Sequence, residues 1–272
     1  MIESTINVCD ILVKNSTYTK DTIKHEFLKD PLKVLITMRF AIQFNFKIDK
    51  VIADVMHDTE VLNQLSNYKF KEKITSELRK MLISNKSIFD TFIEFSDVIA
   101  TIIPEIAFCI NAPHNSPWHK HDIYEHSLYV VDNCNTTKFE IKLAALLHDI
   151  GKPNCRTHDI KNNCDHFRGH SKESERLAKY ILNHELKLSS KEQELILNLI
   201  KEHDKRINPQ IESIRKFIIE YDLNFVRDWL ILKEADIKDH TYNPKNKLKW
   251  EDLLNRLRYF KENFKVIEKL SI

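Results

Sequence analysis

Apolar residues recur at helical spacing along most of this chain. Asp30 and Pro31 are typical of a helix start, with aspartate as N-cap and proline at the first helical position, and a helical period follows through Ile42. The same period predicts helices at 48–56, 70–83, 87–103, 122–134, 138–150, 171–184, 190–202, 210–221, 224–239 and 250–270. The polar segment 152–168 predicts a loop, and no run predicts a convincing strand. We therefore expect an all-α protein.

Prolines interrupt the helical pattern near the middle of the chain. Pro104, Pro113 and Pro117 fall within a short stretch that also contains asparagine and serine. Such residues mark turns and loops. We expect the boundary between two helical domains there.

Composition and charge narrow the class of protein. The 272 residues carry 42 basic and 40 acidic side chains, a net charge of +2 that gives no bulk indication of nucleic-acid binding. Local basic clusters at 69–80 and 245–249 are more typical of a solvated face than of an RNA groove. Five cysteines without a C-x-x-C pair fit reduced thiols. No signal peptide or apolar run of about 20 residues is visible, so we expect a cytoplasmic protein without a membrane partner.

One apolar helix leads directly into metal-type ligands. The run 143–147 is followed by His148 and Asp149, then by Gly151 and Lys152. Imidazole and carboxylate are good ligands for divalent first-row metals, and burying them without a partner is costly. The chain has only two glycines, and the other, Gly169, also lies beside a histidine. This pattern predicts that both glycines shape a site.

Other polar residues occupy similar apolar helices. His126, His203 and Asp236 each lie in or at the end of an apolar-periodic run, and His170 follows Gly169. Taken singly, each fits an ordinary hydrogen-bonded residue of a helical core. Only the joint pattern favours a metal site.

That joint pattern resembles the HD superfamily of metal-dependent phosphohydrolases. The matching motifs are Glu125-His126-Ser127-Leu128, Leu146-Leu147-His148-Asp149-Ile150-Gly151-Lys152, Phe167-Arg168-Gly169-His170 and Glu234-Ala235-Asp236. The resemblance implies that His126, His148, Asp149 and Asp236 hold a first divalent ion, with His170 and His203 available for a second. Mn, Ni, Co, Mg, Fe and Zn are candidates. Asp149, Lys152 and Arg168 are the candidate catalytic residues, and no organic cofactor is implied. Lys152 either neutralises a phosphate or is an ordinary cation at the helix end, and Arg168 either binds a phosphate through two donors or has no such role.

The segment before these motifs resembles a second family. Residues 27–49 and 71–82 are similar to the helical neck of bacterial tRNA nucleotidyltransferases, the CCA-adding enzymes and their poly(A) polymerase relatives, in which an HD domain often follows. The implied layout is a head remnant or linker at 1–21, where Ser4–Asn7 resembles the end of the catalytic head. A neck-like domain then covers 22–108, an HD domain 109–242 and a C-terminal helix 243–272.

The departures from that family limit the implied activity. We expect this chain to lack the catalytic head that precedes the neck in the family. Lys29, Asp30 and Lys33 stand where the family reads the base with Glu-Asp-x-x-Arg, and Lys73 replaces an arginine before the acid matched by Glu77. Lysine lacks the planar fork of arginine. We therefore expect no nucleotide addition by this chain alone.

Two functional hypotheses remain open at this stage. The first is a phosphodiesterase or phosphatase acting on nucleotides or RNA 3′ ends, such as 2′,3′-cyclic phosphates. The alternative is an RNA-binding or partner-docking subunit that contacts tRNA, pairs with a second copy, or receives a separate head subunit.

Overall fold

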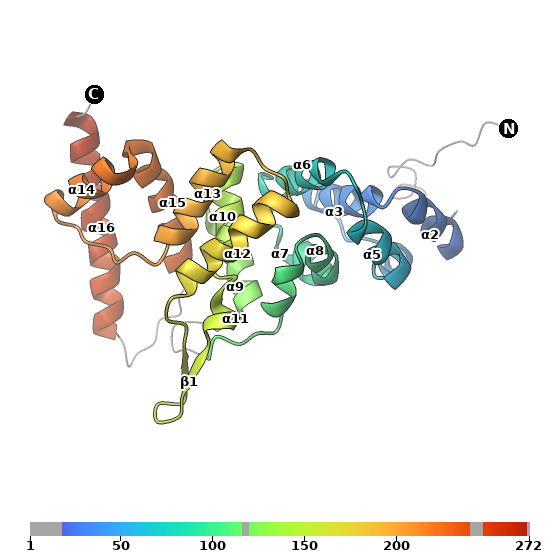
Figure 1. Cartoon of the computed structure of the whole chain (residues 1–272), viewed down its shortest axis with the longest axis horizontal. Coiled ribbons are helices and arrows are strands. Elements are labelled where there is room, and N and C mark those ends of the chain that lie inside the picture. The colour runs from blue at the N-terminus through green and yellow to red at the C-terminus, as the bar shows by residue number, and fades with distance from the viewer. Residues whose placement is uncertain (1–17, 116–119, 240–246, 271–272) are drawn as a thin grey trace. The chain divides into compact units, whose positions relative to one another are not determined.

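The computed structural model describes residues 18–115, 120–239 and 247–270. They form two compact units: the chain up to Ile110 with Tyr180–Ser189, and Asn111–Lys179 with the chain from Ser190 onward. Both units are helical, which confirms the all-α class (Figure 1). The expected head remnant at 1–21 lies outside the described residues except for 18–21, and so does the start of the segment 243–272. No described helix has the length and apolar character needed to cross a membrane.

The first unit is a set of short helices around an apolar core. Its elements are α2 (Lys20–Lys29), α3 (Leu32–Phe44), α4 (Lys50–Met56), α5 (Thr59–Ser66), α6 (Lys71–Leu82), α7 (Phe89–Glu94), α8 (Ser96–Ile102) and the 3-10 helix η1 (Pro104–Phe108). The long helix α3 packs against α6. Phe27, Leu35, Met38 and Leu78 are fully buried in this core.

Two expectations for this unit need correction. The single helix predicted over 87–103 is interrupted at Phe95, whose backbone leaves the helical region while its buried ring stacks on His57. Helices α2 and α5 were not predicted. For α5, the signal is local: the Asp58 side chain accepts a hydrogen bond from the Glu60 amide and begins a new helix.

Charged residues compared with the base-reading motif make contacts inside this unit. Lys33 Nζ lies 2.5 Å from Glu26 Oε2, and both side chains are nearly buried. The Glu77 carboxylate accepts hydrogen bonds from Arg39 and Lys80. Asp30 accepts the Leu32 amide at 3.3 Å, so α3 begins one residue later than predicted. These side chains therefore have structural roles within the unit.

The second unit places a helix with one partly exposed residue and all others buried among three other helices. Its elements are α9 (Ile123–Asn133), α10 (Phe139–Leu147), α11 (Lys152–Cys155), β1 (Thr157–Asp159), β2 (Cys164–His166), α12 (His170–His184, whose last turn belongs to the first unit), α13 (Ser190–Glu202), α14 (Ile211–Tyr221), α15 (Leu223–Asp239) and α16 (Lys247–Leu270). Helix α10 packs against α9, α13 and α15 (Figure 1). This packing brings the end of α10 into the middle of the unit.

The segment 152–168 is more ordered than the predicted loop. It contains the short helix α11 and an antiparallel hairpin in which Asp159 pairs with Cys164 and Thr157 with His166. Strands of three residues with polar side chains are too short to show an alternating apolar pattern. The hairpin therefore has no hydrophobic signal in the sequence.

Candidate metal centre

The six predicted ligands come from five segments and meet in the second unit. His126 lies on α9, His148 and Asp149 directly follow α10, and His170 begins α12; His203 follows α13 and Asp236 lies on α15. His148 and Asp149 are each only 1% exposed. Because every residue of α10 from Leu143 to Leu147 is buried, the end of this helix carries the doublet into the core.

The two glycines allow this arrangement for different reasons. A side chain at Gly151 would overlap the backbone of Glu173 and Ser174, so glycine permits the turn after α10 to touch the first turn of α12. The Gly151 amide also donates to Ser174 Oγ at 2.9 Å. Gly169 has φ +82°, a left-handed conformation that favours glycine. The prediction that both shape the site agrees with this geometry.

A hydrogen bond at Nδ1 fixes the orientation of each predicted histidine ligand. Nδ1 of His148, His170 and His203 donates to the carbonyl of Ala145 (2.7 Å), Phe167 (2.8 Å) and Ile200 (2.6 Å). A carbonyl only accepts, so the proton of the neutral ring is on Nδ1 and Nε2 carries a lone pair. His126 Nδ1 is held in the same way by the Asp239 carboxylate at 2.8 Å. Such contacts orient metal-binding histidines in proteins.

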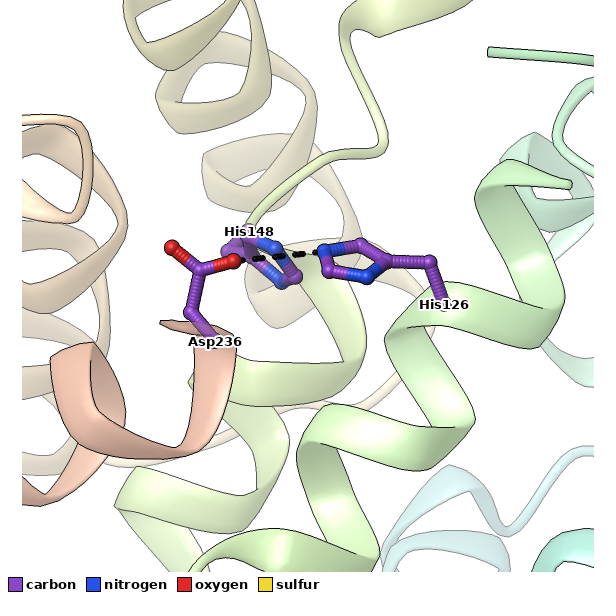
Figure 2. A group of neighbouring side chains, drawn as sticks. All are labelled: His126, His148 and Asp236. Carbon is purple, nitrogen blue, oxygen red and sulfur yellow. Dashed lines mark ion pairs between the residues drawn. The ribbon is translucent and has the colours of Figure 1, made fainter. Parts of the chain in front are cut away.

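The Nε2 atoms converge on the Asp149 carboxylate. Its Oδ2 lies 3.2 Å from His148 Nε2 and 3.5 Å from His126 Nε2, while Oδ1 lies 3.3 Å from His170 Nε2 and 3.5 Å from His203 Nε2. Asp236 Oδ1 lies 3.3 Å from His126 Nε2 and faces the same space (Figure 2). Two triads have ligand atoms within 4.8 Å of one another: His126 with His148 and Asp236, and His148 with Asp149 and His203.

In this arrangement, atoms that accept hydrogen bonds face one another without a donor between them. His170 Nε2 and His203 Nε2, both lone-pair atoms in neutral rings, are 3.0 Å apart. His148 Nε2 and the Asp149 oxygens have no well-aligned hydrogen bond from any described residue, although Lys152 Nζ lies 2.5 Å from Asp149 Oδ2. Buried acceptors in this number require protons or a cation. The nitrogen and oxygen donors fit a divalent metal.

The pKa values of His126 and Asp149 show that the centre stabilises a positive charge beside its carboxylates. Burial opposes protonation of His126, but hydrogen bonds to Asp236 and Asp239 raise its pKa to about 9. Burial also opposes ionisation of Asp149, yet the electrostatic effects of His148 and Lys152 lower its pKa well below the ordinary value. Asp149 therefore remains ionised, and in the metal-free protein Asp236 and Asp239 favour a proton on the His126 imidazole.

The predicted phosphate-binding residues line one cavity beside this centre. The cavity has a volume of about 350 Å³ and contains Lys152, Arg168 and Lys233 together with His148, Asp149, His170, His203 and Asp236 in its walls. Lys152 is buried, whereas Arg168 is exposed at the cavity and has no ion pair with any described residue. The volume is within the range of small-ligand sites.

Helix α15 supports both sides of the centre. Besides carrying Asp236, it donates hydrogen bonds from Trp229 Nε1 to the Glu202 carbonyl (2.8 Å) and from Lys233 Nζ to the His203 carbonyl (2.7 Å). These bonds hold the end of α13, from which His203 extends. The positions of His203 and Asp236 therefore depend on the same helix.

Sequence reasoning missed two residues of the centre. Asp239, which holds His126, lies three residues after Asp236 on the same helical face, so helical spacing could have found it. His114 is 1% exposed, with Nε2 3.0 Å from Lys152 Nζ and 3.9 Å from Asp149 Oδ2. It lies in the proline-containing segment between the helices, where no periodicity indicates a buried position.

Comparisons with known proteins agree with these motifs. A family model described as "HD domain" matches residues 123–240. The chain is 26% identical over 171 residues to the CC-adding tRNA nucleotidyltransferase of Thermus thermophilus, covering 61% of this chain and 39% of the relative. It is 29% identical over 137 residues to the multifunctional CCA protein of Aliivibrio salmonicida, covering 48% and 33%. A shorter match, 40% over 60 residues, links 22% of the chain to 11% of the mitochondrial CCA tRNA nucleotidyltransferase of Candida glabrata.

The chain thus spans well under half the length of these relatives. The shared segments include the helices that carry the histidine and aspartate motifs. Residues 123–240 thus match the HD domain family, in a chain that is similar over this region to the CCA-adding tRNA nucleotidyltransferases.

Proposed function

We propose that the HD domain is a metal-dependent phosphohydrolase that cleaves phosphate esters of nucleotides or RNA ends, including 2′,3′-cyclic phosphates. One observation carries the proposal: lone-pair nitrogens of several histidines, each oriented through Nδ1, face one buried carboxylate. A cation satisfies this set of acceptors better than any described neighbour does. The match to the HD superfamily supports the reaction class.

His126, His148, Asp149 and Asp236 would hold the first ion, and His170 and His203 would extend the site to a second. Mn, Ni, Co, Mg, Fe and Zn all accept such ligands, so the donor set leaves the choice among them open. When bound, a divalent ion supplies Lewis acidity and a nucleophilic water at neutral pH.

The protein's own cations would bind and orient the phosphate. Lys152 presents a buried point charge in the cavity, and Arg168 presents a planar fork that suits two phosphate oxygens at once. Lys233 lies 4.0 Å from Asp236 Oδ2, where it offsets carboxylate charge beside the same cavity. Asp149 orients the surrounding imidazoles and contributes the charge that retains a cation.

A hydrolysis screen tests this proposal. Protein freed of metal by chelation and reloaded with Mn²⁺, Co²⁺, Ni²⁺ or Mg²⁺ should hydrolyse 2′,3′-cyclic AMP, a nucleoside monophosphate or an aryl phosphate. Asp149→Ala should abolish turnover while circular dichroism shows an intact fold, and Asp252→Ala, an exposed site on α16, should leave turnover unchanged. Unchanged turnover in Asp149→Ala rules out the assigned site.

The second candidate function is binding of tRNA or of a partner chain, without nucleotide addition by this chain alone. The similarity to enzymes named for tRNA favours it. The partner would be tRNA, a second copy or a separate head subunit. Binding of tRNA that is unaffected by EDTA, in a protein that hydrolyses none of the esters above, would favour this function over hydrolysis.

A further inference from the structure

A second group of metal-type side chains lies on the hairpin, apart from the buried histidines. Asp159 on β1 pairs with Cys164 on β2, and His166 follows two residues later. Side chains two apart on a strand share a face, and directly paired residues project to the same side of the sheet. Ligand atoms of these three residues lie within 4.8 Å of one another.

The spacing of the three donors is close to that of a zinc site. Cys164 Sγ lies 3.9 Å from His166 Nε2, which lies 3.7 Å from Asp159 Oδ2. Tetrahedral zinc with ordinary bond lengths separates sulfur from nitrogen by about 3.6 Å and nitrogen from oxygen by about 3.4 Å. Each gap therefore needs to close by only about 0.3 Å, which small side-chain rotations achieve.

The hairpin turn holds Asp159 in place as a carboxylate. Its Oδ1 accepts the amides of Lys161 (3.0 Å) and Asn162 (3.1 Å), and its Oδ2 accepts Asn162 Nδ2 (2.7 Å). The bonds from Asn162 lower the pKa of Asp159. The carboxylate is thus oriented and ionised before any cation arrives.

The two faces of the hairpin differ in how their acids are neutralised. On one face, Asp165 contacts both Arg156 and His158 at 2.6 Å. On the other face, Asp159 has no ion pair with a lysine or arginine of the described chain, and its ionisable neighbour is His166. The second face therefore combines an ionised acid, an imidazole and a thiol without a fixed cation.

We propose that Asp159, Cys164 and His166 form a surface site for a thiophilic divalent cation, with zinc the best match. Thiolate, imidazole and carboxylate supply three ligands, and water completes the tetrahedron. Binding releases the thiol proton of Cys164. His166 also lines the cavity beside the buried centre, so the cation would hold part of the cavity rim in place.

Sulfur distinguishes this site from the buried centre, whose ligands are all nitrogen and oxygen. Reduced, metal-free protein titrated with Co²⁺ should develop the near-ultraviolet charge-transfer band of a cobalt thiolate, and added Zn²⁺ should remove it. Cys164→Ser should abolish the band. His166→Asn, which keeps the thiol, should shift the titration midpoint to higher cobalt concentration.

Two controls complete the test. Cys155→Ser, a partly exposed thiol just before the hairpin, should keep the band, and so should Asp149→Asn in the buried centre. The proposal is overturned if wild-type protein shows no band, if Cys164→Ser retains it, or if Cys155→Ser or Asp149→Asn removes it. Circular dichroism of each variant confirms that the fold is intact.

Discussion

Replacing Asp239 should weaken metal binding although this residue is not among the predicted ligands. Its carboxylate accepts the Nδ1 proton of the fully buried His126 at 2.8 Å, which fixes the ring and makes Nε2 a better metal ligand. Loss of such a partner typically costs 10–100-fold in metal affinity. Asp239→Asn keeps an acceptor but not the charge, so we expect about tenfold. Asp239→Ala removes both, so we expect about 100-fold, or about 2.7 kcal/mol.

Competition between the metal-free protein and a chromophoric chelator, with Co²⁺ at fixed pH, measures this affinity directly. Asp228→Asn is a matched control because Asp228 is also a buried acid on α15, but its partner is Lys138 at 2.7 Å. The control should lose stability and keep its cobalt affinity. Wild-type affinity in Asp239→Ala, or an equal loss in Asp228→Asn, would refute the role assigned to Asp239.

Three further predictions concern the stability of the metal-free protein. The pKa of His126, about 9 when folded against ~6.5 unfolded, contributes stability that is complete below pH 6.5 and is lost as the pH rises through 9, on the order of 3 kcal/mol. Melting temperatures in EDTA should show this decline, and His126→Gln should flatten it; a level wild-type profile contradicts the assignment. Gly151→Ala should cost about 1–3 kcal/mol in urea unfolding because its methyl group meets the α12 backbone, and a wild-type midpoint would show that α12 yields freely. Phe95→Ala should cost about 3–5 kcal/mol in the same assay, since its ring is fully buried, and a loss below 1 kcal/mol would indicate that the core closes around the gap.

Much of the candidate centre could be predicted because its residues lie in regular apolar helices. A histidine or aspartate at an inward position of such a helix requires a partner in the core. The resemblance to the HD superfamily indicated which residues these partners are. The structure brings all six predicted ligands together, with the four histidines around Asp149 and with Asp236 facing His126. Their role as metal ligands stays a prediction that the binding experiments test. The place of His114 in the centre was not predicted because its burial depends on tertiary packing of an irregular segment.

The helices of the fold could likewise be predicted where their apolar period is long and regular. Long amphipathic helices such as α13, α14 and α15 were predicted within a few residues of their observed bounds. Short elements such as β1, β2, α5 and α11 were not, because a strand of three residues or a helix of one or two turns carries few apolar positions to show a period. The break between α7 and α8 depends on where the Phe95 ring is buried, which no local pattern encodes.

Because α15 both carries Asp236 and holds the end of α13, removal of the metal should favour local unfolding of these two helices. Its side chains hold the end of α13 through Trp229 and Lys233, and its own Asp236 faces His126. A shift of α15 therefore displaces both Asp236 and His203, which lie on opposite sides of the centre. Backbone amides at the end of α13 and along α15 should exchange with solvent as one cooperative group, faster after chelation than before.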